Sequence, residues 1–203
     1  MNLIDTLRNE VSGQAINRVS QRIGGSNQEV RTAFNFAIPA VLAGILKNGI
    51  NQTDEFQFIT LSAENHNKEF NADLRLNQDE KSLIEDGRQI ISHLFSGEED
   101  ALCGELALET GIDKEKSSTL FAMIVPVIGS YISKLMFNKK WNTQDLMIGI
   151  AESRADINAA LPLNIYSKLN LGATHQMDAA DRPDKTIPFT DGTLIETRQS
   201  FTG

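Results

Sequence analysis

Two apolar segments, each with a proline in its middle, constrain most strongly what this chain can fold into. The first begins at residue 33 and reads AFNFAIPAVLAGILKNG, and the second begins at residue 120 and reads LFAMIVPVIGSYISKLM. A proline inside a helix removes a backbone hydrogen bond and clashes with the preceding turn, which costs about 3 kcal/mol unless the helix bends there. We therefore expect two Pro-kinked core helices, bent at Pro39 and Pro126.

These two segments belong to a longer internal similarity. A shift of 87 residues aligns 4–47 with 91–134 without a gap. We interpret this similarity as an internal duplication, with repeat-like halves at about 1–76 and 77–171. The pairs that coincide under the shift include Ile4 and Ile91, Leu7 and Leu94, Gly24 and Gly111, Thr32 and Thr119, Phe34 and Phe121, Pro39 and Pro126, and Lys47 and Lys134. Structural roles follow for Gly24, Pro39, Gly111 and Pro126.

The chain before residue 172 is typical of helices, apart from the polar stretch 62–78, which is expected to be a connector. Apolar residues recur every three to five positions over 3–23, as in one helix or in two short helices hinged near Gly13. Ser26 followed by Glu29 forms a capping-box pattern, which predicts a helix from there to about Asn48. No strand-rich or βαβ pattern is present, so the predicted fold is an all-α bundle. Further helices are expected over about 53–61, from Asn77 or Asp79 to Gly97, over 99–109, from Asp113 to about 137, and from Thr143 to a point before Pro162.

The composition changes at Gly172. Residues 172–203 have no helical period, and TIPFTDGTLIE places apolar residues on both sides of an Asp–Gly turn, as in a short hairpin. A two-stranded hairpin alone is only marginally stable in water. We therefore predict a helical domain over 1–171 and an irregular tail over 172–203, which either docks on a partner or is disordered. The proposed partner-binding residues of the tail are Ile187, Phe189, Leu194 and Ile195.

The net charge indicates which kinds of partner the chain can bind, and the cysteine content indicates its cellular compartment. The net charge of −8 and the pI of about 4.9 argue against a nucleic acid, because phosphate contacts require clustered Lys and Arg. The single cysteine excludes an internal disulfide framework and fits a reducing compartment. The first residues carry Asp5 and Glu10 and resemble no secretory signal. We expect a cytoplasmic protein, free or incorporated into a larger assembly.

Candidate chemical groups are few. His66, His93 and His175 have no second His or Cys at metal-ligand spacing, and Cys103 is expected to pack as a small apolar residue. The acidic cluster 98–100 lies at a predicted helix start, where free N–H groups favour carboxylates. Phosphate-loop, dinucleotide, paired-histidine and nucleophile-elbow motifs are absent from the sequence. The sequence therefore predicts no catalytic residue, no metal site, no cofactor and no enzymatic activity.

Several segments together resemble a known family. The segment IPAVLAGIL is followed by GRQIISHLFSG and then by TGIDKEKSSTLFAMIVPVIGSYISKL. In this order they are similar to the bacterial YidB-like helical proteins, which are classified as a domain of unknown function, over roughly residues 1–155. The resemblance rests on the segment from Gly87 to Gly97, on Gly111 and on the two proline motifs. It implies an all-helical domain without established chemistry, and it transfers no functional residue.

These observations favour a non-enzymatic protein-interaction or structural module. Such a module would assemble through its acidic helical bundle and its C-terminal docking tail, with a protein partner or as a homo-oligomer. The alternative is a binder of a lipid or a small apolar ligand between the kinked helices. The run 120–137 approaches the length of a membrane span, but it contains Gly129, Ser130 and Lys134, so we expect buried core there and no membrane partner.

Overall fold

A computed structural model of the chain describes residues 2–48, 76–77 and 79–169. Of these residues 84% are helical and none is in a strand, which confirms the predicted all-α bundle. All of them belong to the first of two compact units, which spans Met1–Ala173. The helix expected over 53–61 lies outside the described residues. So do the tail residues Ile187, Phe189, Leu194 and Ile195.

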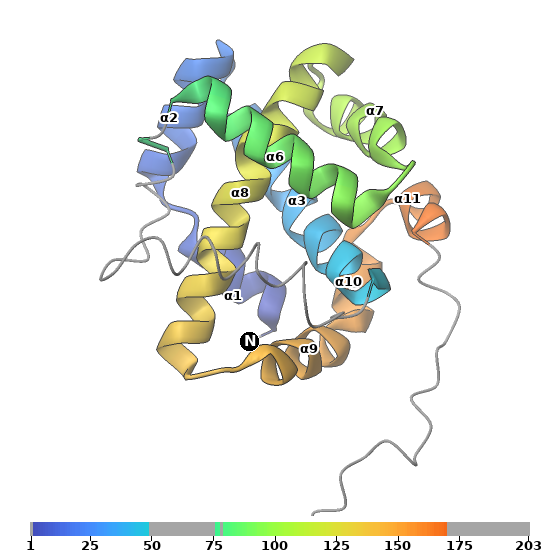
Figure 1. Cartoon of the computed structure of the whole chain (residues 1–203). Coiled ribbons are helices and arrows are strands. Elements are labelled where there is room, and N and C mark those ends of the chain that lie inside the picture. The colour runs from blue at the N-terminus through green and yellow to red at the C-terminus, as the bar shows by residue number, and fades with distance from the viewer. Residues whose placement is uncertain (1, 49–75, 78, 170–203) are drawn as a thin grey trace, which may run out of the picture. The chain divides into compact units, whose positions relative to one another are not determined.

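Within 2–48 and within 79–169, the described helices follow one another through short turns (Figure 1). The segment 3–23 forms two helices rather than one. The backbone becomes extended at Val11, which ends the first helix, and the Ser12 hydroxyl caps the second by accepting from the Ala15 N–H. The described helices are α1 (Leu3–Glu10), α2 (Gly13–Ile23), α3 (Asn27–Asn48), α6 (Glu80–Phe95), α7 (Glu99–Thr110), α8 (Lys114–Lys139), α9 (Thr143–Glu152), α10 (Arg154–Ala160) and α11 (Leu163–Lys168).

Helix α8 forms the centre of the bundle. Every residue from Leu120 to Ser133 is buried, and α1, α2, α3, α6 and α7 all contact this helix. Figure 1 shows α6 crossing it closely. Helix α3 is buried in the same way over 36–45. A helix that is apolar on all sides must be covered on all sides, and the expectation that the two proline segments form buried core is confirmed.

Both proline helices also have the length and apolarity of a membrane span. Their apolar windows are 72% buried in α3 and 89% buried in α8. Core helices of globular bundles pass the same test when their apolar residues are packed against neighbouring helices. Length and composition therefore provide only weak support for a membrane span.

The two proline helices occupy equivalent places along the chain. Helix α3 begins at Asn27 and α8 begins at Lys114, which is the 87-residue shift, and each continues without interruption through its proline. The helices before them end at Gly24 and Gly111, both in the left-handed conformation that glycine adopts without strain. The elements thus agree with the alignment. The duplication itself and the bends at the prolines stay predictions.

The predicted caps are mostly confirmed, with two corrections near the end of the bundle. Ser26 and Glu29 form the expected capping box, and Asp79 and Asp113 cap α6 and α8. The cap of α9 is Asn142 and not Thr143. The Asn142 side chain accepts from the Asp145 N–H, and the Asp145 carboxylate accepts from the Asn142 N–H.

The segment from 143 towards Pro162 was expected to form one helix, and it forms two. Helix α9 ends at Glu152 and α10 begins at Arg154. Ser153, which separates them, is buried, and its hydroxyl accepts from the Leu3 N–H at 3.4 Å. The first amides of a helix have no partner within that helix. The break therefore supplies an acceptor to the start of α1.

The close approach of α6 to α8 depends on Gly87. A Cβ atom added there would lie 1.7 Å from the carbonyl oxygen of Ala122 in α8. We predict that Gly87→Ala lowers the free energy of unfolding by about 3 kcal/mol, since overpacking forces the two helices apart. Urea unfolding followed by circular dichroism measures the change.

Gly104 in α7 provides the matched control. A Cβ atom there would meet nothing within 4 Å, so Gly104→Ala should raise the free energy of unfolding by up to about 1 kcal/mol through helix propensity alone. Equal stabilities of the two alanine variants would contradict the packing that the structure shows.

Candidate functional site

Each core proline leaves one carbonyl group without its helical donor. Proline has no N–H, so the carbonyls four residues earlier, those of Asn35 and Ala122, lack the usual bond. Arg8 Nη2 donates to the Asn35 oxygen at 3.2 Å. The Ala122 oxygen faces the bare Cα of Gly87, in the type of close contact that allows a weak Cα–H···O bond. Neighbouring helices therefore meet both carbonyls.

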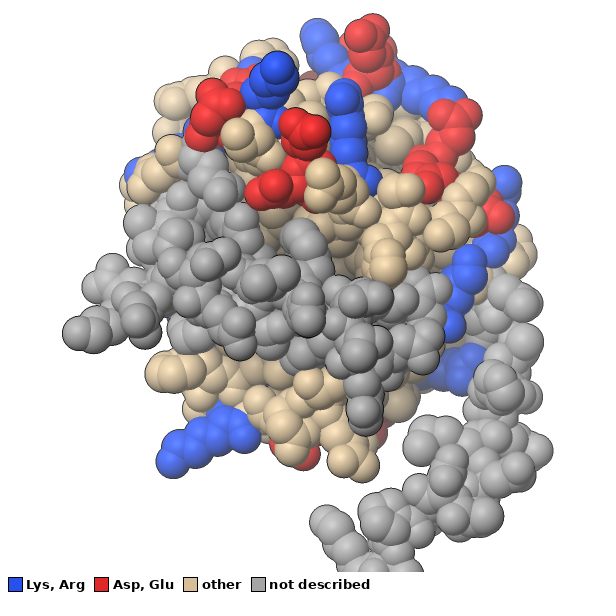
Figure 2. Space-filling model, viewed as in Figure 1, with Lys and Arg blue, Asp and Glu red and all other residues tan. Residues whose placement is uncertain are grey.

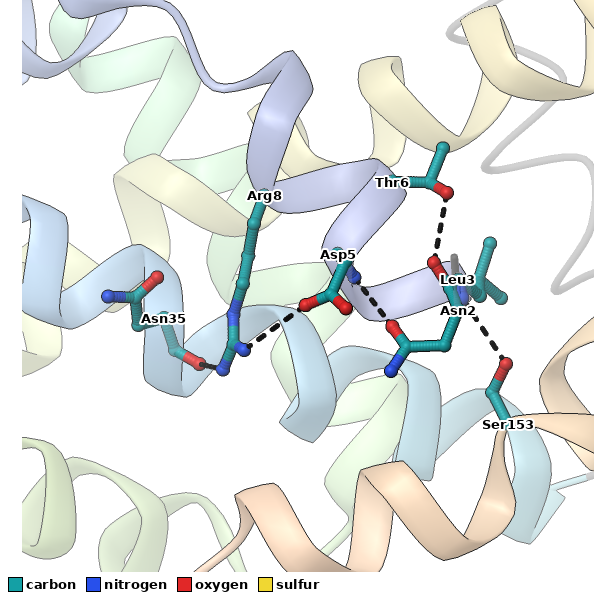
Figure 3. A network of polar contacts seen from close by, with 7 residues as sticks. All are labelled: Asn2, Leu3, Asp5, Thr6, Arg8, Asn35 and Ser153. Carbon is teal, nitrogen blue, oxygen red and sulfur yellow. Dashed lines mark hydrogen bonds and ion pairs between the residues drawn. The ribbon is translucent and has the colours of Figure 1, made fainter.

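The hydrogen bonds around the start of α1 place Arg8 (Figure 3). Asn2 caps this helix by accepting from the Asp5 N–H at 2.8 Å, and the Thr6 hydroxyl donates to the Asn2 carbonyl at 2.9 Å. One turn later the Arg8 guanidinium reaches Asn35 on α3 and lies 3.8 Å from the Asp5 carboxylate. Arg8 is the residue through which α1 makes a polar contact with the proline turn of α3.

Arg8 also lines a pocket of about 480 Å³. The pocket lies where α1, α3 and the C-terminal ends of α7 and α10 meet. We call it the Arg8 pocket; it is lined by Arg8, Thr32, Asn35, Phe36, Glu109, Ala159, Ala160, Leu161 and Pro162. Its polar side chains are one cation, one anion and two neutral groups, and its apolar wall comes mainly from Phe36 and from the turn that follows α10.

Two exposed leucines lie beside this pocket in the sequence. Leu108 on α7 is 78% exposed and Leu163 on α11 is 84% exposed. The Asn164 side chain donates to the Glu105 carboxylate and thereby joins α11 to α7. We call this surface, defined by Glu105, Leu108, Leu163 and Asn164, the α7–α11 edge. It combines two large apolar side chains with a polar link between their helices.

The residues singled out in the sequence mostly have structural positions. Gly24 and Gly111 end helices, and Pro39 and Pro126 are buried in α3 and α8. The glycine turn before Ser26 does not offer a free anion-binding amide at that residue, because the Ser26 N–H donates to Glu29 at 2.6 Å.

Cys103 is buried, as expected for a small apolar residue. Burial raises the pKa of its thiol, although a hydrogen bond with Ser118 acts in the opposite direction. Within the described ranges, no group of three His, Cys, Asp or Glu residues is placed to hold a metal ion. His93 is exposed on α6, while His66 and His175 lie outside the described residues.

The sequence reasoning missed the Arg8 pocket and the α7–α11 edge. One signal for the pocket was present, since a proline in a helix implies an undonated carbonyl four residues earlier. The donor, Arg8, is 27 positions away from Asn35, and no local pattern identifies it.

The bond from Arg8 can be tested against Pro39 with a double-mutant cycle. We predict that Arg8→Met lowers the free energy of unfolding by about 1 kcal/mol, the usual net value of one hydrogen bond. In a Pro39→Ala background the backbone N–H of Ala at position 39 can donate to the Asn35 carbonyl. Arg8→Met should then lower the free energy of unfolding by much less. Urea unfolding of the four proteins gives the coupling energy. If the changes in the free energy of unfolding of the two single variants add up to that of the double variant, Arg8 does not replace the donor that Pro39 lacks.

Comparison with known proteins identifies a family but no relative of known function. The model of the family described as "Bacterial protein of unknown function (DUF937)" matches residues 5–135, which include both core prolines and Gly87. No curated protein and no solved structure matches the chain. The match agrees with the resemblance to YidB-like bacterial proteins. The chain belongs to the DUF937 family of bacterial proteins.

Proposed function

We propose that this chain is a non-enzymatic protein-interaction module that assembles through its acidic helical bundle and its C-terminal tail. The observation that carries the proposal is the α7–α11 edge. Leu108 and Leu163 expose most of their side chains, and the bond between Asn164 and Glu105 joins the helices that present them. Exposed apolar side chains on two helices that a hydrogen bond joins are a surface that a protein partner can cover.

The distribution of charge supports a protein as the partner. Figure 2 shows Lys and Arg side chains interspersed with Asp and Glu over the described part of the face in view. A nucleic acid needs a stripe of basic side chains, whereas mixed charges suit the polar rim of a protein interface. We propose that the partner is another protein or a second copy of this chain, in the cytoplasm.

The chemistry of Cys103 supports a role without catalysis. A nucleophilic cysteine needs a lowered pKa and access to its substrate. Burial excludes access to Cys103 and raises the pKa of its thiol. The proposed module therefore acts by binding, and the proposed contribution of the tail rests on Ile187, Phe189, Leu194 and Ile195.

The structure gives less support to the alternative, a lipid or small apolar ligand between the proline helices. The rings of Phe36 on α3 and Phe121 on α8 meet edge to face at 6.5 Å, and both side chains are buried. Neither the Arg8 pocket nor the shallow pocket along α6 lies between α3 and α8. Side chains rather than ligand space fill the contact at these rings.

We predict that Leu108→Lys with Leu163→Lys weakens assembly at least tenfold without changing helicity, because both side chains are on the surface and contribute little to the core. Sedimentation equilibrium of the full chain measures self-association, and affinity purification with mass spectrometry measures capture of other proteins. Deleting residues 172–203 should abolish the same assembly if the tail is a second contact.

Ile148→Lys is the matched control, because Ile148 is also exposed but lies on α9. It should leave both self-association and capture unchanged. The proposal is wrong if the double lysine variant, the deletion variant and the control all sediment and capture proteins as the unmodified chain does. Native mass spectrometry that shows a retained apolar ligand would favour the alternative.

A further inference from the structure

The Arg8 pocket contains one cation and one anion that are not paired with each other. The guanidinium of Arg8 has five N–H groups. One of them donates to the Asn35 carbonyl, and Nη1 forms a long ion pair with Asp5 at 3.8 Å, which leaves further N–H groups without a partner among the described residues. Glu109 forms no ion pair within the part of the chain that the structure describes. Both side chains therefore have capacity for an outside ligand.

Arg8 and Glu109 have different surroundings, and these determine which charged group of a ligand each residue can bind. Glu109 lies in the last turn of α7, and the partial negative charge of a helix C-terminus disfavours a second anion there and favours an ammonium group. Arg8 lies on α1 and presents its planar guanidinium, which suits a carboxylate. A dicarboxylate would therefore meet repulsion at Glu109, and a diamine would meet repulsion at Arg8.

The size and walls of the pocket fit a small molecule. Its volume of about 480 Å³ is within the usual range of small-ligand sites, roughly 300–1,000 Å³. Phe36, Leu161 and Pro162 provide an apolar wall, and the Thr32 hydroxyl provides a neutral hydrogen-bonding group. A ligand with two opposite charges and a modest apolar part would match each of these features.

We propose that the Arg8 pocket binds a small zwitterion, a free α-amino acid or a short peptide, with its carboxylate on Arg8 and its ammonium on Glu109. The apolar side chain of the ligand packs against Phe36, Leu161 and Pro162. This ligand site shares no residue with the α7–α11 edge, although the two are adjacent in the sequence, and it does not depend on the protein-interaction role.

The test is a titration of the full ¹⁵N-labelled chain followed by NMR. The probes are the standard amino acids and the dipeptides Ala-Ala and Gly-Leu, each compared with its N-acetyl derivative, which lacks the ammonium, and its amide, which lacks the carboxylate. We expect at least one zwitterion to shift the amide signals of Thr32, Asn35 and Glu109 saturably. Each blocked derivative should bind at least tenfold more weakly. Comparing amino acids with dipeptides distinguishes the two sources of the zwitterion.

Glu109→Gln is the decisive variant, because Arg8 also holds the Asn35 carbonyl and its replacement disturbs the fold. Glu109→Gln should weaken zwitterion binding at least tenfold and leave binding of the N-acetyl derivative unchanged. Glu99→Gln, at the other end of α7, should change neither. The proposal is overturned if no zwitterion produces saturable shifts, if the N-acetyl derivative binds as well as the free form, or if Glu109→Gln binds as tightly as the unmodified chain.

Discussion

The helical carbonyls that Pro39 and Pro126 leave without donors are the constraint on which the rest of the bundle depends. A polar backbone group inside a protein requires a partner, and leaving one unpaired costs about 1–3 kcal/mol. The Ala122 carbonyl lies in the fully buried part of α8, and the Cα of Gly87 on α6 faces it. The Asn35 carbonyl lies nearer the surface and accepts from Arg8 on α1. Each core helix is thus tied to a neighbour at the turn that its proline weakens.

The same ties connect the fold to the candidate site. Arg8 is held at the proline turn of α3, and the same side chain lines the Arg8 pocket. Two further contacts hold helix α1. The Leu3 N–H donates to the Ser153 hydroxyl, and Glu10 forms an ion pair with Lys134 on α8 at 2.6 Å. The charged side chain that joins α1 to α3 is therefore also one of the residues that line the pocket. The α7–α11 edge is built separately, since its link is between Asn164 and Glu105.

Local sequence signals predicted much of the bundle, and contacts between distant residues account for what they missed. The Ser26 cap and the left-handed glycines at 24 and 111 have short-range causes, which can be recognised in the sequence. Asn142 and Thr143 are both good cap residues, and the two bonds between Asn142 and Asp145 decide between them. The Asn142 side chain accepts from the Asp145 N–H, and the Asp145 carboxylate accepts from the Asn142 N–H. The bond from Arg8 to Asn35 and the exposure of Leu163 depend on how separate helices pack, which no local spacing encodes.

The central claim is that Arg8 supplies the hydrogen bond that Pro39 withholds from Asn35. The carbonyl ¹³C chemical shift of Asn35 reports this bond directly, because it responds to donation at the carbonyl oxygen. The account predicts that this shift differs between the unmodified chain and Arg8→Lys or Arg8→Met, with the larger change in Met, while the Ala122 carbonyl shift stays the same. An Asn35 carbonyl shift that is identical in all three proteins would contradict it.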